Sequence, residues 1–159
     1  ELTVRADKTK HIWTATYPWV AQSLQRLNDL GYQMAVISNS DGRVDEILKD
    51  LDIRKFFEIV IDSFVVGVEK PDPQIFFIAL QSLGWNPDET IYIGDIFYID
   101  VWGANQAGLG AIHLDKMGLY DDWDGIHIPS IQQLPELLAK MDGNLQDLKL
   151  FPAREFKIG

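Results

Sequence analysis

Apolar residues recur along this chain at two spacings, and segments with the two spacings alternate. Val20, Leu24, Leu27 and Leu30 follow one another at helical intervals, and Gly31 closes that segment. Short uninterrupted apolar runs, which are typical of buried strands, separate it from further helical segments. Strands are expected over 34–37, 57–61, 91–93, 111–114 and 126–128, and helices over 20–30, 44–51, 74–83 and 101–107, with a last helix that is capped by Ser130 and carries Leu134, Leu137 and Leu138.

Strands that alternate with helices are joined by right-handed crossovers, which make the sheet parallel. We therefore expect an α/β fold, a Rossmann-like parallel sheet with helices on both faces. The length of 159 residues and the 47% hydrophobic content are enough for one substantial core, so one domain is the default expectation.

The composition excludes or disfavours several classes of function. The net charge of −10 disfavours a nucleic-acid partner, and the absence of cysteine excludes disulfides and thiolate catalysis. Without an apolar run of membrane length or a signal-type segment, we expect a cytoplasmic protein with no membrane partner. The three histidines, His11, His113 and His127, show no metal-ligand spacing and are interpreted as structural.

The stretch from Ile91 to Asp100 carries the strongest chemical signal. A short apolar strand delivers Gly94 and Asp95, and Asp100 follows five residues later, near the expected start of the next helix. In open α/β sheets, ligands bind beyond the carboxyl ends of the strands. Two carboxylates placed there are suitable ligands for a divalent cation, so the spacing predicts a magnesium site.

Two upstream segments add polar groups of the kind that bind phosphate. The apolar run 34–37 ends in Ser38 and Asn39, so a hydroxyl lies at a strand end. Lys70 comes just before a helix whose start is marked by Asp72 as cap and Pro73 at the first position. The order along the chain is hydroxyl, lysine, acid pair.

These three motifs resemble the second, third and fourth motifs of the haloacid dehalogenase superfamily. The resemblance implies a hydrolase, with Asp95 and Asp100 at a Mg²⁺ ion, Asp100 binding through water or orienting the other ligands. It also implies that the Ser38 hydroxyl and the Asn39 region bind the phosphoryl group. Lys70 would neutralise charge in the transition state, so Lys70 and Ser38 are the predicted catalytic residues.

One motif of that family has no counterpart in this sequence. The family's nucleophile is the first aspartate of an Asp-x-Asp-x-Thr string at the end of the first strand, and this chain has no such string. Asp7, in Asp-Lys-Thr, is a weak substitute because the segment before it alternates instead of being continuously apolar. We interpret 1–16 as a cap-domain remnant or linker, 17–141 as the core domain and 142–159 as a C-terminal extension.

Loss of the first strand has a structural consequence. In the resembling family this strand is central, between the strand that ends at Ser38 and the strand that ends at Asp95. Its loss predicts a gap in the sheet. Segment 2–6, segment 148–156 or a missing portion of chain would fill that gap.

The resulting hypothesis is a magnesium-dependent phosphatase that acts on a small phosphorylated metabolite through an aspartyl-phosphate intermediate. Two alternatives remain open. One is a catalytically silent interaction module, which the absent nucleophile motif would explain. The other is a hydrolase of carbon–halogen bonds. Self-association or an N-terminal segment absent from this chain is a further expectation.

Overall fold

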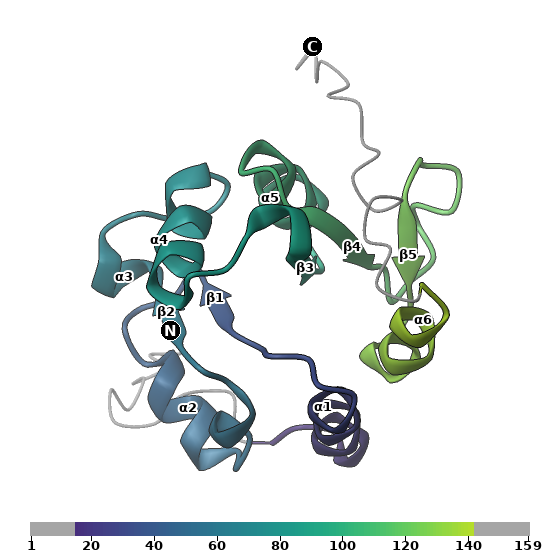
Figure 1. The fold of residues 1–159 in the computed structure, drawn as a ribbon, viewed down its shortest axis with the longest axis horizontal. Helices are drawn as coiled ribbons and strands as arrows, with labels where there is room; N and C mark the ends of the chain where they lie inside the picture. Colours follow the sequence, from purple (N-terminus) through teal and green to yellow (C-terminus); the bar gives the residue numbers. More distant parts are fainter. Residues whose placement is uncertain (1–14, 142–159) are drawn as a thin grey trace, which may run out of the picture.

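Helices and strands alternate along the chain as the apolar pattern predicts (Figure 1). The structure, a computed structural model, describes residues 15–141. The strands are β1 (Val36–Ser38), β2 (Val60–Asp62), β3 (Ile91–Gly94), β4 (Gly110–Leu114) and β5 (Ile126–Ile128). The α-helices are α1 (Pro18–Asp29), α2 (Val44–Asp50), α3 (Ser63–Val66), α4 (Pro73–Leu83), α5 (Gly103–Gln106) and α6 (Leu134–Met141). A π-helix, η3, spans Phe97–Trp102, and short 3-10 turns span Arg54–Phe56, Pro87–Glu89 and Ile131–Gln133.

Helix α4 begins and ends where its sequence predicts. The Asp72 carboxylate accepts a hydrogen bond of 2.9 Å from the backbone N–H of Gln74, and Pro73 occupies the first turn. Gly84 closes the helix in the left-handed conformation, with φ of 67°. This start matters for the site because Lys70 lies directly before it.

The strands form two parallel groups. β1 pairs with β2, and β4 pairs with both β3 and β5, all in parallel. Within the range 15–141, no strand joins β1 to β3, so the described sheet is interrupted at the predicted position of the missing strand. The parallel order is confirmed, and the gap stays a prediction because the two candidate filling segments lie outside the described residues.

Helices cover both faces of the strands. Figure 1 shows α4 and α5 above the strands and α1 and α6 below them. The core on the α4 side is centred on the fully buried Ile75, Phe76 and Val101. On the other side Leu27 of α1 and Leu138 of α6 pack in one cluster that also contains β4 and β5 residues. The predicted α/β class with helices on both faces is therefore confirmed.

Two local features differ from the expectation. The helix predicted over 101–107 begins earlier, because the chain enters η3 directly after Ile96, and Asp100 folds back to accept the Ile96 backbone N–H. Helix α3 was not predicted, because four residues are too few for a hydrophobic period. It is started by Asp62, whose side chain accepts the backbone N–H of Phe64.

Several expectations fall on chain ends that the structure does not describe. The predicted extension 142–159 and nearly all of the predicted remnant or linker 1–16 lie outside the described residues. The same holds for Asp7 and for the two candidate gap-filling segments. Between residues 15 and 141, no helix combines the length and the apolar character that a bilayer crossing requires.

Candidate active site

Asp95 lies at the carboxyl end of β3 with its side chain exposed to solvent. Within residues 15–141 its carboxylate makes no hydrogen bond or ion pair. The preceding residue must be glycine, because a Cβ on Gly94 would lie 2.4 Å from both Cβ and Cγ of Asp100. The backbone that presents Asp95 therefore passes directly against the second acid of the motif.

Asp100 has a different environment from Asp95. Only 3% of Asp100 is exposed, and both of its oxygens are occupied. Oδ1 accepts a hydrogen bond from Nζ of Lys70 at 2.6 Å, and Oδ2 accepts the backbone N–H of Ile96 at 2.9 Å. Asp100 thus fixes the loop after β3 and also binds the lysine.

Lys70 is held by a second contact, with Tyr92 of β3. Its Nζ donates to the Tyr92 hydroxyl at 2.8 Å, and that hydroxyl donates to the carbonyl of Ile37 in β1 at 3.1 Å. Burial, followed by the charge of Asp100, raises the pKa of Tyr92 far above its ordinary value, so the phenol stays protonated. An ammonium has three N–H donors, and these contacts use two of them.

The residues after β1 meet the Lys70 segment directly. The Asn39 side chain accepts the Lys70 backbone N–H and donates to the Lys70 carbonyl, both at 2.8 Å. Ser38 precedes this amide clamp at the end of β1, and its hydroxyl makes no hydrogen bond among the residues that the structure describes. The hydroxyl is therefore available to a ligand.

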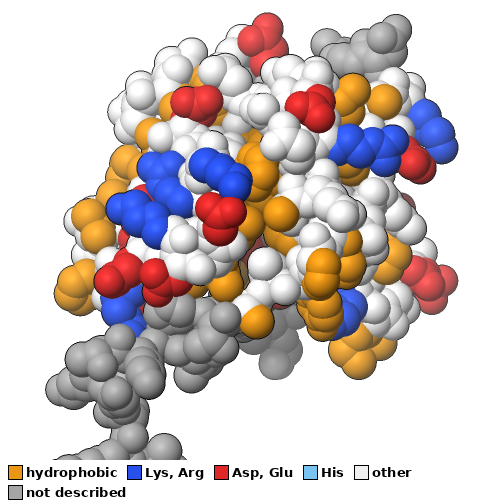
Figure 2. Space-filling view, turned by 90° about the horizontal axis from the view of Figure 1, so that it is seen from below, with side chains coloured by type: hydrophobic (Ala, Val, Ile, Leu, Met, Phe, Trp, Pro, Cys, Tyr) orange, Lys and Arg blue, Asp and Glu red, His pale blue; other side chains and the backbone are white. Residues whose placement is uncertain are grey.

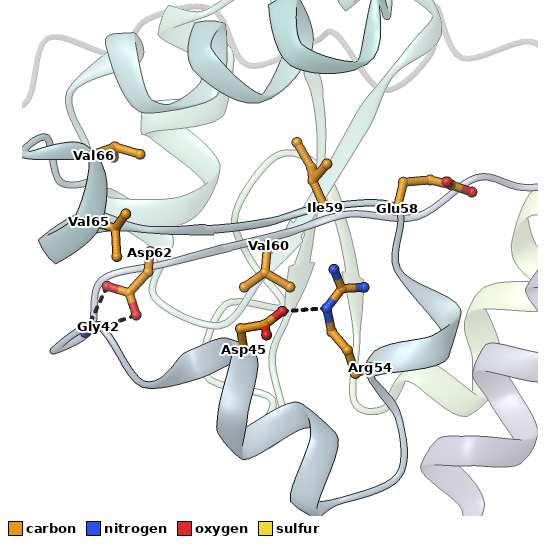
Figure 3. A pocket seen from close by; sticks show the side chains of 9 residues that line it. All are labelled: Gly42, Asp45, Arg54, Glu58, Ile59, Val60, Asp62, Val65 and Val66. Atoms are coloured by element: carbon orange, nitrogen blue, oxygen red, sulfur yellow. Dashed lines mark hydrogen bonds and ion pairs between the residues drawn. The ribbon is translucent and has the colours of Figure 1, made fainter.

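A buried acid in β2 shapes the loop that follows Ser38 and Asn39. Both oxygens of Asp62 accept the Gly42 backbone N–H, at 3.1 and 3.0 Å, and one also accepts that of Val44 at 3.3 Å. Figure 3 shows this contact at one end of a cavity of about 390 Å³, where an Arg54–Asp45 ion pair lies farther along β2. Asp62 therefore acts on the site by positioning its loop.

The sequence-predicted residues meet at one edge of the fold. Asn39 contacts Lys70, Lys70 contacts Asp100, and Asp100 lies against the glycine that precedes Asp95. Ser38 follows Ile37, whose carbonyl accepts a hydrogen bond from the Tyr92 hydroxyl. The arrangement brings a hydroxyl, a cation and a free carboxylate to the carboxyl ends of β1 and β3, where parallel sheets bind ligands.

The donors at this edge suit a hard cation only in part. Mg²⁺ is commonly bound by one or two carboxylates, several waters and substrate phosphate oxygens. Asp95 offers a carboxylate without competing partners, which fits that pattern. Both Asp100 oxygens already accept hydrogen bonds and the side chain is buried, so Asp100 is less suited than Asp95 to direct cation binding.

Sequence reasoning missed Tyr92 and Asp62. Tyr92 lies in an apolar strand, where an aromatic residue indicates core packing, and nothing in the sequence predicts its contact with Lys70. For Asp62 a signal was present, because an acid at a strand end followed by Ser63 is a cap pattern. Neither residue could be assigned a role in the site without the contacts between segments.

An apolar cavity of about 360 Å³ lies between the two groups of strands. Val36 and Ile37 of β1 line one side, Ile91 and Ile93 of β3 line the other, and Leu27 of α1 contributes to it. The facing edges of β1 and β3 have no strand partner within the described residues. Figure 2 shows hydrophobic side chains along the middle of one face, between two groups of charged side chains.

Comparison with known families gives a match over most of this chain. The family described as haloacid dehalogenase-like hydrolase matches residues 4–108. This range includes the hydroxyl, lysine and acid motifs.

Individual relatives include phosphatases and a dehalogenase. The chain is 38% identical over 117 residues to a glyceraldehyde 3-phosphate phosphatase of Methanopyrus kandleri, with 73% of this chain and 50% of that protein covered. A HAD phosphatase structure from Thermococcus onnurineus matches with a TM-score of 0.72 and 28% identity, covering 77% of this chain and 57% of that one. A 2-haloacid dehalogenase structure from Pseudomonas syringae matches with a TM-score of 0.67 and 29% identity, covering 78% of this chain and 53% of that one. The chain therefore spans about half the length of these relatives.

Proposed function

We propose that this chain, which belongs to the haloacid dehalogenase-like hydrolases, provides the metal-binding and phosphoryl-binding groups of a magnesium-dependent phosphatase. The observation that carries the proposal is the position of Lys70. Its ammonium is fixed between Tyr92 and Asp100 and lies at the same edge as the free carboxylate of Asp95. The substrate class is a small phosphorylated metabolite, in keeping with the relative named as a glyceraldehyde 3-phosphate phosphatase.

Lys70 and Ser38 are the proposed catalytic residues. The third N–H of Lys70 and the hydroxyl of Ser38 would donate to oxygens of the phosphoryl group, with Asn39 holding the Lys70 backbone in place. Donors that are fixed before the substrate arrives need little reorganisation as charge moves onto the phosphoryl oxygens. Lys70 acts in this scheme as a fixed positive charge and moves no proton.

Asp95 is the proposed direct ligand of Mg²⁺. A bound magnesium ion would supply positive charge next to the phosphoryl oxygens. Asp100 has the supporting role of fixing Lys70 and the loop that presents Asp95, and its own contact with the cation would run through water.

The nucleophile is proposed to be an aspartate on a strand that occupies the cavity between β1 and β3. The cavity is apolar and is lined by β1 on one side and β3 on the other. A strand inserted in parallel would end beside Ser38 and Asp95. Its carboxylate oxygen would attack phosphorus as the bond from phosphorus to the alkoxide breaks, and the alkoxide would take a proton from water and leave as the alcohol. Water would then cleave the aspartyl-phosphate to inorganic phosphate and the free carboxylate.

A second candidate function is hydrolysis of a carbon–halogen bond. It is favoured by the 29% identity to a 2-haloacid dehalogenase. The free carboxylate of Asp95 favours the phosphatase, because halide displacement has no use for a cation at that position.

The test is magnesium-linked binding of inorganic phosphate by the 159-residue chain, measured by calorimetry with and without Mg²⁺. Asp95→Asn is the main variant, since its exposed side chain makes no contact that folding depends on. Asp52→Asn, at an exposed acid far along the chain, is the matched control. Lys70→Met is informative only where its circular dichroism matches wild type, because it leaves Asp100 buried without its cation.

The proposal expects phosphate binding that requires Mg²⁺, is lost in Asp95→Asn and is unchanged in Asp52→Asn. Binding that ignores Mg²⁺ or survives Asp95→Asn would overturn it. Hydrolysis of p-nitrophenyl phosphate by the same samples then locates the nucleophile. Turnover places it within the chain, with Asp7 the first residue to replace. Phosphate binding without turnover means that this chain supplies no nucleophile, which fits either a segment supplied from outside or a catalytically silent module.

A further inference from the structure

We propose that His113, His127 and Asp115 form a second metal site, for a divalent transition-metal ion that prefers imidazole ligands. His113 lies in β4, His127 lies opposite it in β5, and Asp115 follows β4 directly. One ligand atom from each side chain lies within 4.8 Å of the other two. His113 and Asp115 are buried and His127 is half-buried. The proposal is independent of the phosphatase activity.

The two imidazoles face each other through their Nδ1 atoms. Nε2 of His113 lies 3.2 Å from the carbonyl oxygen of Asp95, and Nε2 of His127 lies 3.3 Å from that of Trp123. Because a carbonyl only accepts, each neutral ring should carry its single proton on Nε2. Both Nδ1 atoms then present lone pairs to each other across 3.0 Å. That approach is repulsive unless a positive species binds to both nitrogens.

The surroundings provide a third ligand and an aromatic enclosure. The Phe97 and Tyr120 rings pack edge-on against His113, and the Tyr120 ring stacks on His127. A metal ion can draw on the carboxylate of Asp115 as a third ligand and as a compensating negative charge. Two histidines and one carboxylate form a ligand set that transition metals commonly use.

Asp115 is held ready for this role by the turn that follows β4. The Tyr120 N–H lies 2.8 Å from Oδ2. This hydrogen bond fixes the carboxylate beside the two imidazole nitrogens.

The spacing of the two nitrogens limits the choice of metal. With metal–nitrogen bonds of ~2.1 Å, nitrogens 3.0 Å apart subtend about 90° at the ion. This angle suits an octahedral site, so Co²⁺ and Ni²⁺ fit as well as or better than a tetrahedral Zn²⁺. The site also differs from the oxygen-only donors at Asp95. Bound metal would link β4, β5 and the loop 115–125, and the ring of His113 would lie between the metal and the carbonyl of Asp95.

The experiment is a titration of the chelator-treated 159-residue chain with Co²⁺, followed by its visible absorption and by long-range proton–nitrogen NMR spectra of the histidine rings. His127→Gln is the main variant, because glutamine can still donate to the Trp123 carbonyl and the position is only half-buried. Asp115→Asn is the second variant. His11→Gln is the matched control, since it removes the remaining histidine of the chain.

We expect one Co²⁺ per chain, Nδ1 resonances of two histidines that shift on binding, and an affinity at least about tenfold weaker in His127→Gln and in Asp115→Asn. His11→Gln should bind as wild type does. An absence of Co²⁺-dependent shifts at the histidine nitrogens would overturn the proposal. So would an equal loss of affinity in His11→Gln, or Co²⁺ binding that is abolished by Asp95→Asn alone.

Discussion

Lys70 and Asp100 form a buried ion pair, with 2.6 Å between Nζ and Oδ1 and side chains that are only 10% and 4% exposed. The two residues are 30 positions apart in the sequence. Lys70 precedes α4, and Asp100 lies in η3 behind the loop that presents Asp95. The pair therefore fixes two of the family's motif segments relative to each other.

Asp100→Asn should lower the free energy of unfolding by about 3 kcal/mol, because a buried ammonium is left without its counter-charge. Urea unfolding followed by circular dichroism measures this change. Asp52→Asn removes the acid of the exposed ion pair with Lys55 and should change stability by less than about 0.5 kcal/mol. Equal effects of the two replacements would show that burial of the Lys70–Asp100 pair has no energetic consequence.

Gly94→Ala should destabilise the protein by more than about 2 kcal/mol, since the added methyl group would overlap Asp100 and force the loop to move. The same replacement at Gly31 meets open space and has only its left-handed backbone, with φ of 86°, to strain it. Gly31→Ala should therefore cost about 1 kcal/mol. Thermal unfolding of both variants provides the comparison, and a Gly94→Ala protein as stable as Gly31→Ala would contradict the close approach.

Tyr92→Phe should cost about 1 kcal/mol near neutral pH, because the variant loses the hydroxyl that joins Lys70 to the Ile37 carbonyl. Its stability should also respond differently to alkali. The pKa of Tyr92 is raised in the folded state, while in the unfolded chain the phenol ionises near its ordinary pKa of about 10. The unfolded state therefore binds fewer protons above that pH, and wild-type stability should fall as the pH rises further.

The variant should lack this part of the alkaline loss. Urea midpoints between pH 8 and pH 11 for wild type and Tyr92→Phe make the measurement, with the range set by the phenol pKa of about 10. Parallel curves for the two proteins would mean that Tyr92 ionises as easily in the folded protein as in the unfolded chain.

Asp62→Asn should destabilise the protein by about 2 kcal/mol, because its carboxylate accepts charge-assisted hydrogen bonds from the backbone of Gly42, Val44 and Phe64. It should also weaken magnesium-linked phosphate binding, since the loop after Ser38 loses its support. Calorimetric titration with phosphate tests the second effect. Asp41→Asn, at an exposed acid of the same loop, is the control and should leave binding unchanged.

Much of the fold could be predicted because it depends on local signals. Neighbouring residues alone predict the cap of α4 by Asp72, its closure by Gly84 and the five apolar strands. The interruption between β1 and β3 could be predicted from the family resemblance. The early start of η3 could not, since it depends on Asp100 turning back to Ile96.

The candidate site could be predicted only in outline. Strand-end positions placed Ser38 and Asp95 at one edge of the sheet, but the partners of each side chain depend on how segments pack. The commitment of both Asp100 oxygens and the bridging hydroxyl of Tyr92 arise from contacts between residues far apart in sequence. His113 and His127 were interpreted as structural, and their pairing could not be predicted for the same reason, because the register of β4 against β5 aligns residues 14 positions apart.

A crystal structure of the chain grown with Mg²⁺ and tungstate, an electron-dense mimic of phosphate, tests the central claim most directly. The account predicts one tungstate ion within hydrogen-bonding distance, about 3 Å, of both Lys70 Nζ and Ser38 Oγ. It also predicts a cation bound to the Asp95 carboxylate beside it. Tungstate bound away from Lys70, or a cation that binds other acids and leaves Asp95 in solvent, would contradict the account.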